Sequence, residues 1–80
     1  MKKNVQMPRL SENMDVGVLV AWNKEAGEAI KKGEILFEVE TEKVISEVES
    51  LESGIIAEIF YEEGDQIGVN DVIAVIDCIE

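Results

Sequence analysis

An internal repeat with an offset of 37 residues is the feature that most limits how this chain can fold. Laid over the first half, the second half matches it at glycines and apolar residues, which are the positions that backbone geometry and packing constrain. The matched pairs are Gly17/Gly54, Gly27/Gly64, Ile30/Ile67, Ile35/Val72, Leu36/Ile73 and Val39/Ile76. Two copies are too few for a solenoid, which needs three or more repeats. We therefore predict one domain over residues 1–80 with pseudo-two-fold symmetry.

Short alternating or β-branched segments predict strands in both copies of the repeat. They cover residues 5–8, 17–22, 35–42, 44–50, 55–60 and 72–77. Segments rich in glycine, asparagine and aspartate separate them, as expected for turns. No segment carries a sustained apolar stripe at the 3.6-residue period of a helix. The pattern predicts an all-β sandwich or flattened barrel of short antiparallel strands.

The distribution of charge narrows the classes of function. Residues 1–32 carry six bases and four acids, whereas residues 33–80 carry one base and fourteen acids, and the net charge is −11. Such a surface repels phosphate backbones, so we expect no nucleic-acid partner. It suits a partner protein that presents basic residues. No apolar run approaches the ~20 residues that span a membrane, so we expect no membrane segment.

The side chains that usually carry catalysis or hold metals are few. The chain has no histidine, which removes the commonest general base and a frequent metal ligand. We therefore expect no catalytic residue and no metal site. The single cysteine, Cys78, excludes an intramolecular disulfide and fits a reducing compartment. We expect a monomer in a bacterial-type cytoplasm, in preference to a mitochondrial matrix.

Lys43 is the candidate functional residue. It is the only base after Lys32 and lies between two predicted strands whose apolar and acidic residues alternate. The segment 41–44 lacks glycine, asparagine and proline, which favours a type I turn. The repeat places this turn at the pole opposite both chain ends. The flanking carboxylates favour the charged ammonium over a nucleophilic amine. Lys43 is thus interpreted as a modification site, with a solvated surface lysine as the alternative.

Two segments resemble the lipoyl domains of the biotinyl and lipoyl carrier family. MPRLSENM at residues 7–14 is similar to the opening of lipoyl domains in acyltransferase components of 2-oxo acid dehydrogenase complexes, and EVETEKVISEVE at residues 38–49 is similar to their modification hairpin. The usual tip of these domains is Asp-Lys-Ala, where this chain has Glu42, Lys43 and Val44. Biotinyl relatives usually carry methionine on both sides of the lysine, so the flanking residues favour lipoate over biotin.

The resemblance implies two four-stranded antiparallel sheets with Lys43 at a hairpin tip. It also implies a lipoyl group in amide linkage on Lys43, attached by a lipoate–protein ligase, with Glu40, Glu42 and Val44 as recognition residues. The carrier would be non-catalytic. It would shuttle acyl groups and reducing equivalents between a thiamin-diphosphate-dependent decarboxylase, an acyltransferase core and a dihydrolipoyl dehydrogenase.

Three alternatives stay open at this level. The parent complex could act on any of several 2-oxo acids or on acetoin. The chain could instead be a biotin carboxyl carrier domain with the same fold. It could also be an unmodified acidic protein-interaction domain.

Overall fold

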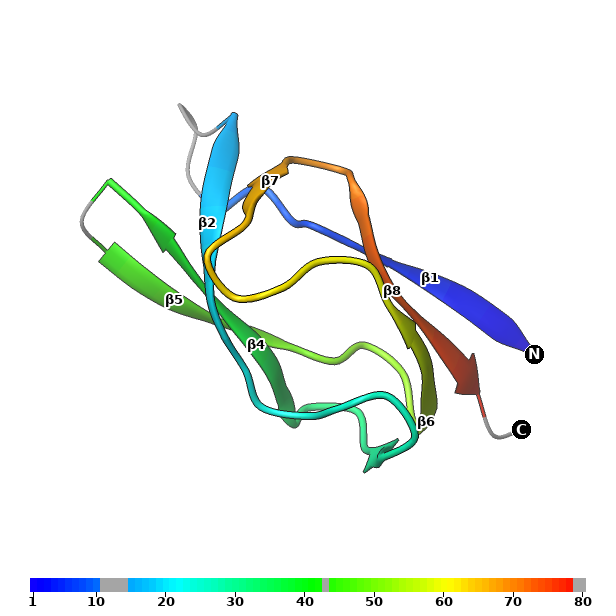
Figure 1. Cartoon of the computed structure of the whole chain (residues 1–80). Coiled ribbons are helices and arrows are strands. Elements are labelled where there is room, and N and C mark those ends of the chain that lie inside the picture. The colour runs from blue at the N-terminus through cyan, green and yellow to red at the C-terminus, as the bar shows by residue number, and fades with distance from the viewer. Residues whose placement is uncertain (11–14, 43, 79–80) are drawn as a thin grey trace.

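The computed structural model describes residues 1–10, 15–42 and 44–78, so the predictions for Lys43 and for part of the segment 7–14 lie outside the described residues. The described residues form eight strands in two four-stranded antiparallel sheets (Figure 1). Sheet A has the order β1-β8-β6-β3 and sheet B the order β5-β4-β2-β7. The bounds are β1 Lys2–Gln6, β2 Val16–Trp22, β3 Ala29–Ile30, β4 Ile35–Thr41, β5 Val44–Glu49, β6 Gly54–Ile59, β7 Gln66–Gly68 and β8 Val72–Cys78. The prediction of an all-β sandwich of two four-stranded sheets is confirmed.

The two sheets repeat each other strand by strand. With the offset of 37 residues, β6 corresponds to β2, β7 to β3 and β8 to β4, in the same order within each sheet. The first strands follow a different offset. Lys2 pairs with Asp77 in sheet A, and Ile45 pairs with Glu40 in sheet B. Lys2 and Ile45 are therefore counterparts, and they are 43 residues apart instead of 37. The connection between β1 and β2 is longer than the one between β5 and β6, and it absorbs the difference.

Three strands differ from the sequence prediction. β3 and β7 were missed because runs of two and three residues are too short to show a period. They form because they pair with β6 and β2. The first strand covers Lys2–Gln6 instead of 5–8. Its polar residues lack a strand pattern, but they complete the ladder of β8, whereas Met7 leaves the ladder and is fully buried.

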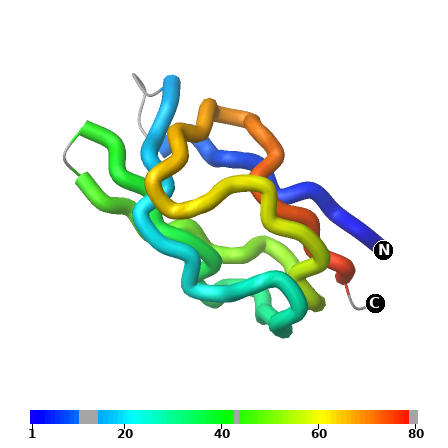
Figure 2. Tube along the Cα trace, in the orientation of Figure 1, coloured from blue at the N-terminus to red at the C-terminus, as the bar shows by residue number. Residues whose placement is uncertain are grey.

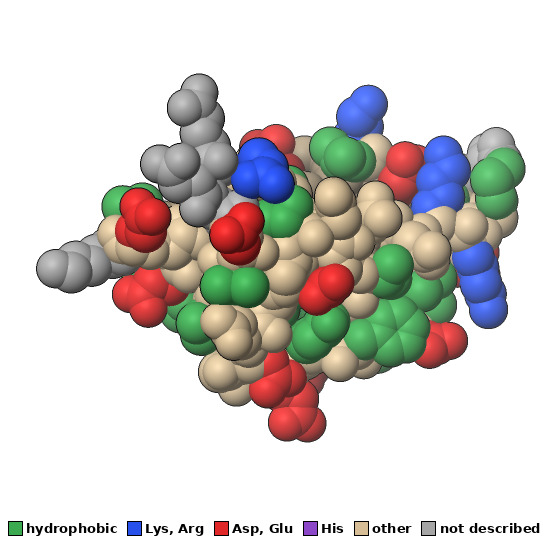
Figure 3. Space-filling model, turned by 90° about the horizontal axis from the view of Figure 1, so that it is seen from above, with side chains coloured by type: hydrophobic (Ala, Val, Ile, Leu, Met, Phe, Trp, Pro, Cys, Tyr) green, Lys and Arg blue, Asp and Glu red, His purple; other side chains and the backbone are tan. Residues whose placement is uncertain are grey.

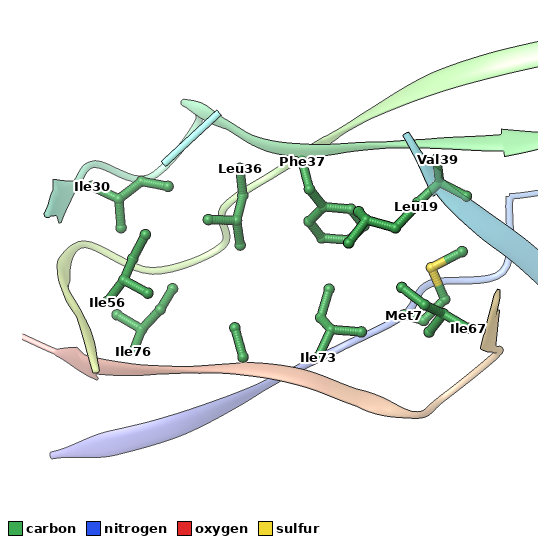
Figure 4. Close-up of a cluster of buried hydrophobic side chains, with 11 residues drawn as sticks. Met7, Leu19, Ile30, Leu36, Phe37, Val39, Ile56, Ile67, Ile73 and Ile76 are labelled. Atoms are coloured by element: carbon green, nitrogen blue, oxygen red, sulfur yellow. The ribbon is translucent and has the colours of Figure 1, made fainter. Parts of the chain in front are cut away.

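The core lies between the sheets and repeats the symmetry (Figure 4). Apart from Met7, its members fall into pairs 37 residues apart: Leu19/Ile56, Ile30/Ile67, Leu36/Ile73, Phe37/Ala74 and Val39/Ile76. Two neighbouring residues, Leu36 and Phe37, can both point inward because the register of β4 against β5 shifts between Ile35 and Phe37. Such bulges bend a strand and re-aim its side chains. Each large apolar side chain buried this way contributes about 1.5–3 kcal/mol.

The chain ends and the β4–β5 hairpin lie at opposite ends of the molecule, whose longest extent is 36 Å (Figure 2). The amide of Cys78 donates to the carbonyl of Met1 at 2.7 Å, which holds the two described ends together. In sheet A this pair of ends occupies the place that the hairpin connection has in sheet B. The predicted opposition of hairpin and termini is confirmed. Within the described residues, no helix is long and apolar enough to cross a membrane.

Candidate functional site

The β4–β5 hairpin lies at the end of the molecule opposite the termini (Figure 1). Thr41 pairs with Val44, so only residues 42 and 43 connect the two strands. The side chain of Val44 is 60% exposed although it is apolar, and Glu42 is also exposed. Lys43 itself lies outside the described residues. Its two chain neighbours are therefore displayed to solvent at the end of the domain farthest from the termini (Figure 1).

The backbone of Glu42 is left-handed, with φ of 45°. The predicted type I turn is therefore wrong, because a type I turn needs φ near −60° at this position. Two-residue hairpin connections favour type I′ or II′ turns, whose twist matches that of the flanking strands. Strand pairing imposes this conformation on a glutamate, although an L-residue other than glycine, asparagine or aspartate adopts it at a cost.

Replacing Glu42 with asparagine is expected to stabilise the domain by about 0.5–1 kcal/mol, because asparagine tolerates the left-handed region better than glutamate. The midpoint of urea unfolding should rise. The matched control is Glu49→Asn in β5, where asparagine is placed in an extended strand and should lower the midpoint. Equal shifts in the two variants would contradict the assignment of strain to Glu42.

The predicted recognition residues gather at this end of sheet B. Glu42 and Val44 flank position 43, and Glu40 is exposed one residue before the end of β4. The four strands of sheet B contain Glu38, Glu40, Glu47 and Glu49 but no lysine or arginine. Figure 3 shows the basic side chains mostly toward the end that holds the termini. The described strands that lead to position 43 therefore carry acidic side chains and no basic ones.

Sequence reasoning missed two apolar neighbours of the site. In the ladder of sheet B, Glu40 pairs with Val18 on one side and with Ile45 on the other. Val18 is 38% exposed and Ile45 is 53% exposed, so both face solvent beside the carboxylate. Alternation along residues 17–22 and 44–50 could have indicated their outward direction. Only the strand order places them next to Glu40.

A groove of about 640 Å³ lies between the two edge strands β1 and β5, away from the hairpin connection. Its apolar lining includes Val5, Leu10 and Val48, which pack against the core. The smaller hollow beside Trp22 includes Tyr61, whose pKa is raised, first by desolvation and then by the charge of Asp71. Among the described residues, no group of three or more cysteine, aspartate or glutamate side chains could hold a metal ion.

Comparison with known proteins shows the family of the chain. The family model Biotin_lipoyl, described as "Biotin-requiring enzyme", matches residues 3–76. A dihydrolipoyllysine-residue acetyltransferase component of the pyruvate dehydrogenase complex from Zymomonas mobilis is 47% identical over 94% of this chain. A dihydrolipoyllysine-residue succinyltransferase component of the 2-oxoglutarate dehydrogenase complex from Staphylococcus saprophyticus is 40% identical over 90% of it. The chain spans 17% of the length of each of these relatives.

Solved structures agree with the sequence comparisons. The lipoyl domain of the 2-oxoglutarate dehydrogenase complex from Azotobacter vinelandii has a TM-score of 0.73 and 34% identity, covering 89% of this chain and 90% of that domain. Urea carboxylase from Kluyveromyces lactis has a TM-score of 0.79 at 20% identity, covering 95% of this chain and 6% of that protein, which shows a shared fold alone.

Proposed function

Because the chain belongs to the biotinyl and lipoyl carrier family and its relatives are dihydrolipoyllysine acyltransferase components, we propose that it is a lipoyl carrier domain modified on Lys43. The observation that carries the proposal is the β4–β5 hairpin. Its connection consists of residues 42 and 43, and it lies at the opposite end of the domain from the termini. A chain joined to other domains through its termini would thus extend the modified residue away from its tether.

The described residues around position 43 fit an attached group. Glu42 and Val44, the two neighbours of position 43 in the chain, are both exposed to solvent. A lipoyl group in amide linkage supplies a dithiolane that takes up an acyl group and electrons. The role of this chain's own residues is presentation. The paired strands β4 and β5 lead to the connection, and the acidic side chains on these strands mark it for partners. The domain itself is non-catalytic in this proposal.

The relatives' names support a place in a multienzyme complex. We place the domain with a thiamin-diphosphate-dependent decarboxylase, an acyltransferase core and a dihydrolipoyl dehydrogenase in a 2-oxo acid or acetoin dehydrogenase complex. Tethering one carrier near several active sites raises its effective concentration at each of them. The relatives include both acetyl and succinyl transferases, so they support the class of complex and leave its substrate open. The proposed setting is a bacterial-type cytoplasm, with the isolated domain as a monomer.

Biotin is the second candidate for the attached group, because the family model that matches the chain has the description "Biotin-requiring enzyme". The residues beside position 43 favour lipoate. They are Glu42 and Val44, whereas biotinyl domains usually have a methionine on each side of the modified lysine. The names of the relatives also point to lipoate.

The decisive experiment is incubation of the domain with a lipoate–protein ligase, ATP and lipoate, followed by intact mass spectrometry. ATP activates the lipoate carboxyl as an adenylate with release of diphosphate, and the lysine amine then displaces AMP and loses a proton. One lipoyl group should be added to the wild type and none to Lys43→Ala. The matched control is Lys24→Ala, which removes a lysine between β2 and β3 and should leave the addition intact. Failure of the wild type with lipoate, combined with modification by biotin ligase, would replace lipoate by biotin.

A further inference from the structure

The outer face of sheet B next to the hairpin combines apolar side chains with carboxylates. We call it the acidic face and define it by five residues: Val18, Glu38, Glu40, Ile45 and Glu47. One ladder row places Glu40 between Val18 and Ile45, and the next places Glu38 directly opposite Glu47. On β4, Glu38 and Glu40 point outward because Phe37 and Val39, which alternate with them, are fully buried. The other three residues pair directly with these glutamates and so share their face of the sheet.

The pseudo-two-fold symmetry supplies an internal control for this face. In sheet A, the position of Glu40 is taken by Asp77 and that of Ile45 by Lys2, so the row contains opposite charges. The position of Glu38 is taken by Val75, which pairs with Asn4 in place of Glu47. The same backbone thus forms around a lysine and around neutral residues. The fold does not require an exposed isoleucine or a pair of glutamates at these positions.

The paired glutamates even oppose folding. Residues directly opposite across an antiparallel ladder have Cβ atoms about 4.5–5.5 Å apart, and like charges there are destabilising. The strands of sheet B provide no lysine or arginine to offset them. The ion pairs between described residues, Met1–Asp77, Lys3–Glu52 and Lys24–Glu34, join other carboxylates. A partner that brings cations to the acidic face would relieve this repulsion.

We propose that the acidic face docks a basic surface of the enzyme that attaches the group to Lys43, an inference that rests on the proposed function. An enzyme forming a bond to a lysine amine must enclose that side chain, so it approaches the strand ends beside position 43. Those ends belong to β4 and β5, which also carry four of the five residues of the acidic face. Enzymes that act on the far end of a long attached arm do not need to approach the strand ends beside position 43.

The chemistry of the face specifies the docking surface of that enzyme. Guanidinium groups suit carboxylates because they donate two parallel hydrogen bonds. One or two arginines would lie over Glu38 and Glu47. An apolar side chain would cover Val18 and Ile45, whose exposed surface is removed from water on docking.

The test compares ligation kinetics of charge variants with a lipoate–protein ligase, ATP and lipoate. Glu38→Gln/Glu47→Gln should lower kcat/KM about tenfold at low salt, mainly through KM. The dependence of kcat/KM on salt should also be shallower for this variant. It lacks two of the exposed charges whose attraction to a partner is screened at about 1 M salt. The control Glu58→Gln/Glu62→Gln removes the same charge from exposed positions elsewhere and should behave as the wild type. Urea unfolding should show a midpoint for Glu38→Gln/Glu47→Gln at or above that of the wild type.

A second variant tests the apolar part of the face. Ile45→Lys copies the arrangement of sheet A, where Lys2 pairs with Asp77. It should keep the urea midpoint and lower kcat/KM for ligation, because it offers a cation to Glu40 and removes an apolar contact.

The outcomes separate the two proposals. If Lys43 is modified but the acidic-face variants match the control, the docking proposal is overturned and the carrier function stands. If the variants ligate normally and instead slow acyl transfer from a 2-oxo acid decarboxylase, the occupant is the decarboxylase and the proposal as stated fails. A wild type that accepts no lipoate overturns both.

Discussion

Replacing Gly54 with alanine is expected to cost the domain about 3 kcal/mol or more, the upper end for overpacked sites. A Cβ added at Gly54 would collide with the backbone carbonyl oxygen of Asp77 and would lie 2.8 Å from the Cα of Cys78. Both atoms belong to β8, which pairs with β6 at this position, so no side chain can move aside. A domain of this size has only about 4–12 kcal/mol of stability in total. The midpoint of urea unfolding measures the loss.

Two other glycines provide controls for this prediction. Gly27 has φ of 95° and nothing within 4 Å of an added Cβ, so Gly27→Ala isolates the conformational cost of about 1–2 kcal/mol. At Gly17, the counterpart of Gly54, the nearest atom is Cγ1 of Val39 at 2.5 Å, which belongs to a side chain. Gly17→Ala should therefore be milder than Gly54→Ala and should be partly rescued by Val39→Ala. A loss at Gly54 no larger than that at Gly27 would refute the steric explanation.

Replacing Phe37 with alanine is expected to destabilise the domain by about 3–5 kcal/mol, the range for emptying a buried aromatic site. Phe37 is fully buried, and its ring lies 5.4 Å from that of Trp22 at an interplanar angle of 54°. Its counterpart in the repeat is the small Ala74, so the other sheet offers no bulky side chain at the equivalent position. Trp22 is the only tryptophan, so its fluorescence reports both the unfolding transition and the lost ring contact.

The control for Phe37 is Ile55→Ala. Ile55 is a large apolar residue on the outer side of β6 and is 40% exposed, so its truncation should cost well under half as much. Similar losses in the two variants would mean that the core between the sheets does not dominate stability. An unchanged tryptophan spectrum in folded Phe37→Ala would contradict the described ring packing.

The strands beside position 43 could be predicted because the alternation of neighbouring residues along the sequence indicates them. Alternation around Lys43 indicated two strands with a short connection, because side chains of a strand alternate between faces. The turn type was mispredicted because local residue preferences favoured type I, whereas the twist of the paired strands holds Glu42 at φ of 45°. Val18 and Ile45 were missed as neighbours of Glu40, since adjacency across a sheet depends on strand order.

The sequence by itself determined the class of fold, the two-fold repeat and the position of the connection between residues 41 and 44 relative to the chain ends. These follow from periodicity and from apolar positions that recur every 37 residues, because a buried face must be apolar wherever it occurs along the chain. The tertiary structure alone decided β3, β7 and the start of β1, which form only because neighbouring strands offer unpaired backbone groups. It also decided that Glu38 faces Glu47, since register sets which charges meet and is a property of two strands together.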